Sequence, residues 1–268
     1  MPELPEVAGY RKYFEKYALG RKIGSAQVKA PRIIRGITAG QLEGELTGRT
    51  FISTLQHGKY LFAQTDGAGW LVEHFGMTGG LRYFEDHDEP PKFDRFLIVF
   101  ETGGALSYVN QRMFGWIGLT ADPAGLIEGK GLGPSALDPG FDYGEFKRIF
   151  SGKTGEIKAA LLNQKLVAGI GNLYADEILF QARLHPQAKI IGLGEKELQS
   201  VYRIMREVLR TAIETNSDIE RLPPKYFLPH RKKGGGCPAC LSVLQTVKAA
   251  GRTSYFCPRC QQENSPSR

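Results

Sequence analysis

The chain has 268 residues, 41% of them apolar, which is enough for one large domain or two small domains with buried cores. Thirty-five lysines and arginines against 28 aspartates and glutamates leave a net charge of +7, and this excess favours a polyanionic partner. The start, MPELPEVAGY, lacks the basic and apolar regions of a secretion signal, and no stretch approaches the roughly 18 apolar residues of a membrane span. We therefore expect a folded, soluble, intracellular protein with no membrane partner.

The first 128 residues are predicted to form a mostly β domain that begins with a helix. Apolar residues recur at helical spacing near the N-terminus, at Val7, Tyr10, Phe14 and Ala18. Gly20 follows at the position of a left-handed C-cap. Short β-like runs separated by turn signals come next, at 24–29, 50–56, 59–65, 70–75, 96–101 and 105–110. Their spacing is typical of an antiparallel sandwich or barrel.

Residues 129–140, with the sequence GKGLGPSALDPG, are predicted to be an interdomain linker, because glycine and proline break any regular period there. The period then becomes helical, in runs at 143–150, 156–162, 172–182 and 196–214. Residues 141–228 are therefore predicted to form a helical domain. A polar segment broken by prolines closes this domain and leads to a cysteine-containing module at 229–262.

All four cysteines lie in that last module, in two C-x2-C pairs: Cys237 with Cys240, and Cys257 with Cys260. This spacing allows two knuckles to wrap one tetrahedral Zn²⁺, with a hairpin or loop between them. Four thiolate ligands leave no position for a water molecule, so the sequence predicts one structural zinc ion. Two disulfides or a redox dithiol are the alternatives.

The positive charge is concentrated near the C-terminus, where residues 229–268 contain seven basic side chains and one acidic side chain. Such a cluster is typical of nucleic-acid binding, although a solvated charged tail has the same composition. Arg252 lies between the two cysteine pairs, where a metal-bound hairpin would hold it ready to read a phosphate. A salt-bridged surface arginine is the alternative interpretation of Arg252.

The segment VAGIGN, residues 167–172, lies between two helical runs. Gly169 and Gly171 allow the backbone to approach a bulky partner, and Asn172 opens the next helix, where free N–H groups and the helix dipole attract a phosphate. Asn172 is equally consistent with a plain helix N-cap.

The N-terminus itself carries a candidate nucleophile. Removal of Met1 would leave Pro2 with a secondary α-amine, a group that titrates near pH ~8 and is partly unprotonated at neutral pH. Such an amine can attack a sugar C1′ carbon and form an iminium. Two carboxylates follow, at Glu3 and Glu6, and Glu3, next to the amine, would transfer protons. Lys59, in a predicted turn, would hold a phosphate or protonate a leaving group. The alternative is a disordered start followed by a helix cap.

Six separated motifs together resemble the formamidopyrimidine-DNA glycosylase and endonuclease VIII family. They are MPELPEV at the N-terminus, GKYL at 58–61, HFGMTG at 74–79, GPSAL in the linker, KAALLNQKLVAGIGNLYADEIL at 158–179 and CPAC…GRTSYFCPRC at 237–260. The resemblance runs through the whole chain in the family's order. It implies an α+β protein with an N-terminal β-sandwich that carries the first helix, a helix-two-turn-helix domain and a four-cysteine zinc finger.

The resemblance also implies a function: a bifunctional DNA glycosylase and abasic-site lyase of base excision repair, acting on double-stranded DNA with a damaged base or an abasic site. Pro2 would be the Schiff-base nucleophile, Glu3 the acid/base residue, Glu6 a supporting group and Lys59 a ligand of the phosphate next to the lesion. The implied DNA-binding residues are His74, Met77, Arg112, Phe114, Lys158, Asn172 and Arg252. Met77, Arg112 and Phe114 would fill the gap left by the flipped nucleotide. We expect a monomer in the cytoplasm or at the nucleoid.

Two departures from the family pattern bear on the choice of lesion. Oxoguanine enzymes usually read Asp-Pro-Arg-Arg-Phe-Gly where this chain has Asn110-Gln111-Arg112-Met113-Phe114-Gly115, which removes one basic residue. Residues 216–236 are shorter than the lesion-capping loop of those enzymes and carry Lys232 and Lys233. 8-Oxoguanine, formamidopyrimidines, oxidised pyrimidines and hydantoins remain alternatives. A non-catalytic zinc-finger protein that binds abasic or distorted DNA is the alternative from another class.

Overall fold

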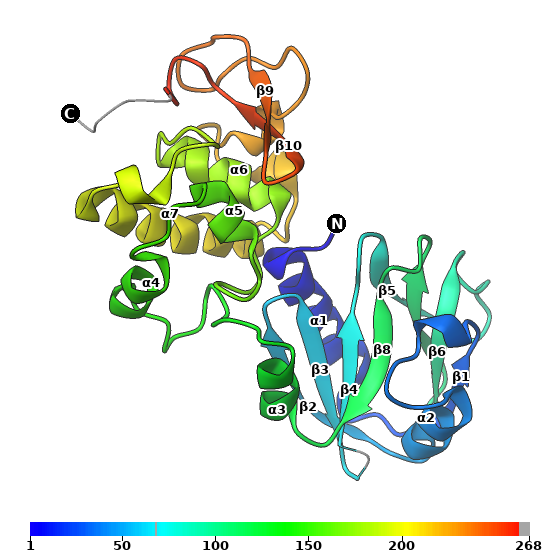
Figure 1. Cartoon of the computed structure of the whole chain (residues 1–268). Coiled ribbons are helices and arrows are strands. Elements are labelled where there is room, and N and C mark those ends of the chain that lie inside the picture. The colour runs from blue at the N-terminus through cyan, green and yellow to red at the C-terminus, as the bar shows by residue number, and fades with distance from the viewer. Residues whose placement is uncertain (68, 263–268) are drawn as a thin grey trace. The chain divides into compact units, whose positions relative to one another are not determined.

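The computed structural model describes residues 1–67 and 69–262, and the chain divides into two compact units, one ending at Gly131 and the next beginning at Leu132 (Figure 1). The first unit contains α1 Leu4–Ala18, β1 Ile23–Val28, η1 Pro31–Ile33, α2 Ala39–Leu46, β2 Phe51–His57, β3 Tyr60–Thr65, β4 Trp70–His74, β5 Gly79–Phe84, β6 Asp94–Phe100, β7 Ala105–Asn110, β8 Trp116–Thr120 and α3 Pro123–Gly129. The second contains α4 Tyr143–Phe150, α5 Ile157–Leu162, α6 Asn172–Gln181, η2 Ile190–Gly192, α7 Glu195–Glu214, η3 Ile219–Arg221, η4 Leu228–His230, β9 Gln245–Ala249 and β10 Arg252–Phe256. In the described part of the chain, no helix is long and apolar enough to cross a membrane.

The first unit is a sandwich of two four-stranded antiparallel sheets, ordered β1-β6-β7-β5 and β2-β3-β4-β8 (Figure 1). Side chains alternate across each strand, so one face of each sheet supplies a common core. That core includes Leu61 and Ile117 from one sheet, Ile98 and Leu106 from the other, and Phe14 from α1. The helix α1 therefore lies against the sandwich, and its N-terminal turn is fixed by packing.

Strands β5 and β8 and helices α2 and α3 of the first unit were not predicted. The sequence of β5 explains why this strand has no clear pattern. Strand β5 begins with two glycines, and a Cβ on Gly79 would lie only 2.2 Å from the carbonyl oxygen of Phe75. Close backbone approach therefore replaces the β-branched pattern that marks a strand. Helix α2 contains two glycines but buries Leu42 and Leu46, and it begins with a capping box between Thr38 and Gln41. That T-x-x-Q signal was present in the sequence.

The second unit is helical, and α6 forms its centre, with seven consecutive buried residues from Tyr174 to Phe180. The expected linker 129–140 divides between the units. Gly129 ends α3, whereas Gly133 and Ala136 donate backbone hydrogen bonds to the carbonyls of Gln164 and Ala168 in the second unit. From Leu132 on, the segment is thus an ordered part of the helical unit.

The segment between α7 and the cysteine module is also ordered by α6. The carboxylate of Glu177, which is fully buried, accepts hydrogen bonds from the backbone N–H groups of Phe227, at 3.1 and 2.9 Å, and Leu228, at 2.8 Å. Burial raises the pKa of Glu177 to about 6, while these N–H groups act in the opposite direction. A single buried side chain therefore fixes the path of the chain towards η4.

Candidate functional site

The candidate nucleophile lies at the start of α1. Glu3 is the N-cap residue, and its backbone N–H donates to Glu6 Oε2 at 2.8 Å while its side chain accepts from the backbone of the same turn. The side chains of Glu3 and Glu6 thus form a reciprocal capping box, and Pro5 stands in the first turn, where its missing N–H costs nothing. Glu3 is 1% exposed, whereas Met1 is 42% exposed. The capping box therefore does more than begin the helix: it holds the buried Glu3 in place next to Pro2.

Gln56 joins this helix start to the turn that carries Lys59. Its side-chain Nε2 donates to the carbonyl oxygens of Leu4, at 2.9 Å, and Gly58, at 3.0 Å. Gly58 has φ +54°, and the tight Gly58-Lys59 turn connects β2 with β3. One amide group thus brings the first turn of α1 and the β2–β3 turn together. Sequence reasoning missed Gln56, because a glutamine at the end of a strand has no pattern of its own.

His74 lies at the end of β4, and its ring is 4.9 Å from the ring of Tyr60 and 6.4 Å from that of Trp116. Burial and the positive charges of Lys59, Arg35 and Lys130 lower the pKa of His74 to about 4. The imidazole is therefore neutral at pH 7. Its Nδ1 atom is buried and has no hydrogen-bond partner among the described residues.

The three residues expected to fill a gap in DNA occupy two neighbouring loops of the first unit. Met77 is 40% exposed and Phe114 is 56% exposed, although both are large and apolar. The Arg112 guanidinium carbon lies 5.1 Å from the centre of the Phe114 ring. Exposed apolar side chains of this size on ordered loops are typical of a binding surface, whereas a core residue would be covered.

The side chain of Asn110 connects the loop that carries Met77 to the loop that carries Arg112 and Phe114. Its Oδ1 accepts from the Met113 N–H at 2.9 Å and from Thr78 Oγ1 at 3.1 Å, and its Nδ2 donates to Tyr108 Oη at 3.0 Å. Thr78 Oγ1 in turn accepts from the Arg112 N–H at 2.9 Å. Met113, where the oxoguanine enzymes carry a basic residue, is half-buried against the core of the sandwich. Asn110, noted in the sequence only as a departure, is thus the residue that shapes both loops.

Glu73 is a second feature that the sequence did not reveal. It precedes His74 in β4 and faces Leu61 and Ile117 in the sheet register, so it points into the apolar core. Glu73 is 1% exposed, and its Oε2 atom has no hydrogen-bond partner among the described residues. Burial raises its pKa to about 8, so the carboxyl group is largely protonated at pH 7.

The four cysteines form one cluster in which all sulfur atoms lie within 4.8 Å of one another. Cys237 Sγ is 3.8 Å from Cys260 Sγ, and Cys240 Sγ is 3.4 Å from Cys257 Sγ. Tetrahedral ligands at a Zn–S distance of 2.3 Å stand about 3.8 Å apart, so the cluster fits one Zn²⁺. The four sulfurs are therefore the ligand set of a structural zinc ion, which would tie the two ends of the β9–β10 hairpin.

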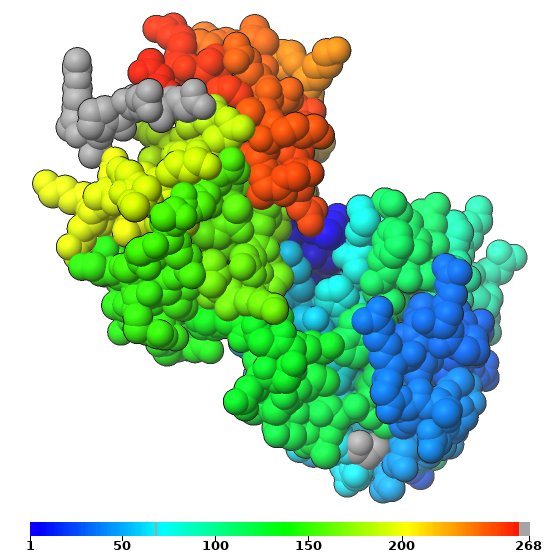
Figure 2. All heavy atoms as spheres, in the orientation of Figure 1, coloured from blue at the N-terminus to red at the C-terminus, as the bar shows by residue number. Residues whose placement is uncertain are grey.

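The hairpin presents Arg252 near its tip, and the β9–β10 segment forms an orange-red ridge on the second unit (Figure 2). Arg252 is exposed and makes no ion pair with any described residue, so it is not the salt-bridged surface arginine considered as the alternative. Asn172 lies beside the same strand, and its Nδ2 donates to the Thr253 carbonyl oxygen at 3.2 Å. The N-cap of α6 is Gly171, so Asn172 is the first residue within the helix and does not act as its N-cap.

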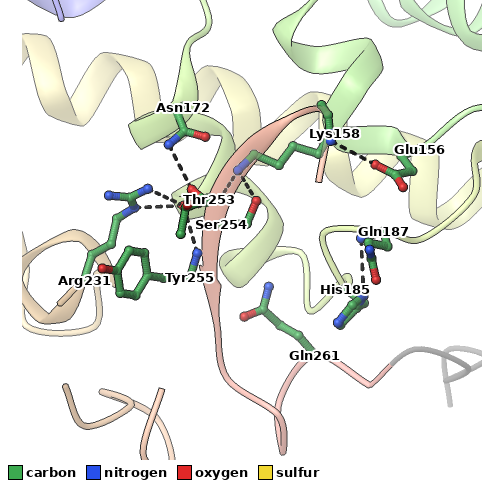
Figure 3. Close-up of polar contacts among 12 residues, drawn as sticks. Glu156, Lys158, Asn172, His185, Gln187, Arg231, Thr253, Ser254, Tyr255 and Gln261 are labelled. Atoms are coloured by element: carbon green, nitrogen blue, oxygen red, sulfur yellow. Dashed lines mark hydrogen bonds and ion pairs between the residues drawn. The ribbon is translucent and has the colours of Figure 1, made fainter. Parts of the chain in front are cut away.

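Lys158 does not occupy the position that a DNA ligand needs. Its side chain has no exposed surface, and its Nζ lies 2.5 Å from Asp176 Oδ1 in a buried ion pair. It also donates to Ser254 Oγ of β10 (Figure 3). The expected direct contact of Lys158 with DNA is therefore corrected: the ammonium group connects α5 and α6 to the zinc-bound hairpin.

Comparisons with known proteins cover both units and the cysteine module. Residues 1–117 match the formamidopyrimidine-DNA glycosylase N-terminal domain, residues 132–222 the formamidopyrimidine-DNA glycosylase H2TH domain, and residues 237–262 a zinc finger found in FPG and IleRS. The formamidopyrimidine-DNA glycosylase of Pelobacter propionicus is 34% identical over 98% of this chain and 100% of its own length, and that of Acaryochloris marina is equally similar. The chain belongs to the formamidopyrimidine-DNA glycosylase family.

Solved structures agree with this assignment. The formamidopyrimidine-DNA glycosylase of Lactococcus lactis, bound non-covalently to DNA containing an AP site, aligns with a TM-score of 0.89 at 33% identity, over 97% of this chain and 99% of that one. The same Lactococcus lactis protein bound to DNA containing N7-benzyl-Fapy-dG aligns with a TM-score of 0.88. The β-sandwich, helical unit and four-cysteine module that the sequence predicted are confirmed.

Proposed function

We propose that this protein is a DNA glycosylase of base excision repair that removes oxidatively damaged bases and then cleaves the strand as an abasic-site lyase. Family membership supports the glycosylase activity, and the Lactococcus lactis relative has been solved with abasic and damaged DNA. The observation that carries the proposal is the N-terminus. Buried Glu3 stands next to Pro2, and Gln56 ties this turn to the turn that carries Lys59.

In the proposed reaction, removal of Met1 bares the secondary amine of Pro2. Its unprotonated nitrogen attacks C1′ of the damaged nucleotide, and the bond from C1′ to the base breaks as the base takes up a proton. The proline nitrogen loses its proton, and protonation of O4′ breaks the C1′–O4′ bond, which opens the sugar and leaves an iminium between C1′ and Pro2. This iminium acidifies the C2′ proton. Loss of this proton breaks the C3′–O bond and releases the 3′ phosphate, and a second elimination releases the 5′ phosphate. Glu3 carries the protons, Glu6 holds Glu3 through the capping box, and Lys59 binds the phosphate next to the lesion.

The DNA contacts come from both units. Met77, Arg112 and Phe114 would occupy the space of the extruded nucleotide and recover part of the lost stacking free energy. His74, which is neutral at pH 7, would act as a hydrogen-bonding group near Lys59 and not as a phosphate-binding cation. Asn172 and Arg252 would bind backbone phosphates, since the first lies at a helix N-terminus and the second at an exposed hairpin.

Borohydride trapping tests the nucleophile. An intact-mass measurement first establishes that Met1 is absent from the purified protein. The protein is then incubated with duplexes that contain an abasic site, 8-oxoguanine, formamidopyrimidine or thymine glycol, and borohydride reduces any imine to a stable adduct. We expect a covalent adduct with abasic DNA, a strongly reduced yield for Pro2→Gly and a retained adduct for Lys59→Ala. The damaged bases that also give adducts define the lesion range.

Two outcomes would overturn the proposal. An adduct that survives blocking of the terminal amine would mean that a lysine attacks C1′. The absence of any adduct from protein with a free Pro2, together with tight binding of abasic DNA, would favour the non-catalytic zinc-finger protein.

A further inference from the structure

Asp176 is a buried residue of α6 on which donors from three other segments of the chain converge. Lys158 Nζ of α5 lies 2.5 Å from Asp176 Oδ1. Arg231, just after η4, reaches Asp176 Oδ2 with its Nε at 2.8 Å and its Nη2 at 2.7 Å. The backbone N–H of Tyr255 in β10 donates to the same oxygen at 3.2 Å. Figure 3 shows the side chains of Lys158 and Arg231 reaching β10 from opposite sides.

The partners of Asp176 hold the part of β10 that follows Arg252. Lys158 also donates to Ser254 Oγ, and the Arg231 guanidinium carbon lies 4.8 Å from the centre of the Tyr255 ring. The Thr253 carbonyl oxygen accepts from Asn172 Nδ2 (Figure 3). Thr253 and Tyr255 are thus held to α6 and Ser254 to α5, in the three residues that directly follow the exposed Arg252.

This anchoring differs from what the cysteine cluster provides. The cluster joins the two ends of the hairpin to each other, and its Cys237 and Cys257 pack with Phe180 near the C-terminal end of α6, whereas Asn172, at the first residue of α6, bonds to Thr253 next to Arg252. Asp176 lies between these two ends of α6 and binds β10 directly through the Tyr255 N–H, and the side chains of Asp176 and its partner Lys158 are fully buried. Buried charges require their partners in a fixed geometry, because an unpaired charge away from water is strongly destabilising. The carboxylate therefore helps to fix the placement of β10 on α6.

We propose that Asp176 is a positioning residue for phosphate recognition: it sets β10 against α6, and so keeps Arg252 beside Asn172, without touching DNA itself. The inference rests on the proposed function, since it takes a DNA phosphate as the ligand of Arg252 and Asn172. It assigns the buried Lys158 and Arg231 a supporting role in the same network.

The test compares Asp176→Asn with a matched control, Asp218→Asn. The control makes the same change at an exposed aspartate, the N-cap residue of η3. Zinc content is measured on each purified full-length protein. KM, kcat and the salt dependence of binding are then measured on duplex DNA with an abasic site. We expect Asp176→Asn to retain one zinc ion, to raise KM roughly tenfold with kcat changed much less, and to flatten the salt slope by about one phosphate contact. Asp218→Asn should match the wild type.

A double-mutant cycle separates positioning from general destabilisation. If Asp176 acts through Arg252, Asp176→Asn changes the salt slope and KM little further once Arg252→Ala is present, because the two residues serve one contact. Effects that add in full would overturn the proposal, as would a single Asp176→Asn variant with wild-type KM and salt slope.

A milder variant covers the case in which Asp176→Asn loses its fold. Arg231→Lys keeps the charge but loses the two-nitrogen contact to Asp176 Oδ2 and the stacking on Tyr255. It should show the same rise in KM at smaller size, and an unchanged KM would overturn the inference. A wild-type protein that neither excises a damaged base nor forms a borohydride-trapped adduct would instead overturn the proposed function. The two failures are therefore distinguishable.

Discussion

Gly76 and Gly115 pack backbone against backbone, so that a Cβ built on Gly76 would lie 2.3 Å from the backbone nitrogen of Gly115. Gly76 precedes Met77, and Gly115 follows Phe114. The contact therefore joins the two loops that carry the exposed apolar side chains of the first unit, and it leaves no room for another atom. The φ of +62° at Gly76 is a further reason why only glycine suits this position.

Gly76→Ala is accordingly expected to push the loops apart. We predict a loss of about 2–4 kcal/mol in the free energy of unfolding, measured by urea denaturation, and a larger loss of excision from duplex DNA than of cleavage of a single-stranded abasic substrate. Gly44→Ala, in α2 with no heavy atom within 4 Å of the added Cβ, is the control and should be neutral or slightly stabilising. Equal losses on both DNA substrates would contradict the link between loop geometry and base extrusion.

The buried carboxyl group of Glu73 predicts a pH-dependent stability. Its pKa of about 8 exceeds the ordinary value of 4.5, so the folded protein keeps a proton that the unfolded chain releases. The stabilisation from this proton is fully present below pH 4.5 and is lost as the pH rises through 8. Glu73→Gln removes the titration and should exceed the wild type by on the order of 3 kcal/mol at pH 7, with little difference at pH 4. Urea denaturation from pH 4 to 9 measures both, and a difference that does not change with pH would exclude a titrating Glu73.

Phe114 should matter for the extrusion of a base and not for the chemistry. Phe114→Ala removes a 56% exposed ring, so folding stability should change by less than about 1 kcal/mol. Excision of a paired lesion should fall roughly tenfold or more, because base stacking on an aromatic ring contributes a few kcal/mol. Borohydride trapping on single-stranded abasic DNA should be unaffected. A parallel loss on the single strand would place Phe114 in a different role.

Arg252 is predicted to read one phosphate irrespective of sequence. Arg252→Ala should weaken binding to every duplex and reduce the slope of log K against log salt by about 0.9. Arg259→Ala, an exposed arginine of the same cysteine module, provides the matched control and should leave the slope nearly unchanged. Fluorescence anisotropy between low and physiological salt measures the slopes, and identical slopes for the wild type and Arg252→Ala would remove Arg252 from the phosphate contacts.

The sequence predicted the elements whose pattern repeats along the chain. The spacing of Val7 to Ala18 placed α1, and the two C-x2-C pairs placed the zinc ligands, because helix period and ligand spacing are local properties. The contacts that arrange the site were not accessible in this way. Gln56 and Asp176 bind residues far away in the chain, and Glu73 is enclosed by apolar residues of the neighbouring strands. Only the folded backbone brings these residues together.

Met113 has a consequence for how the enzyme searches a genome. Met113 is uncharged and half-buried against the sandwich core, so under the proposed function this loop would offer undamaged DNA one cation fewer than a loop with a basic residue there. Dissociation from ordinary sequence would then be faster, with less time spent at each site between lesions. Long-lived binding would depend more on the insertion of apolar side chains into a double helix that a damaged nucleotide has already weakened.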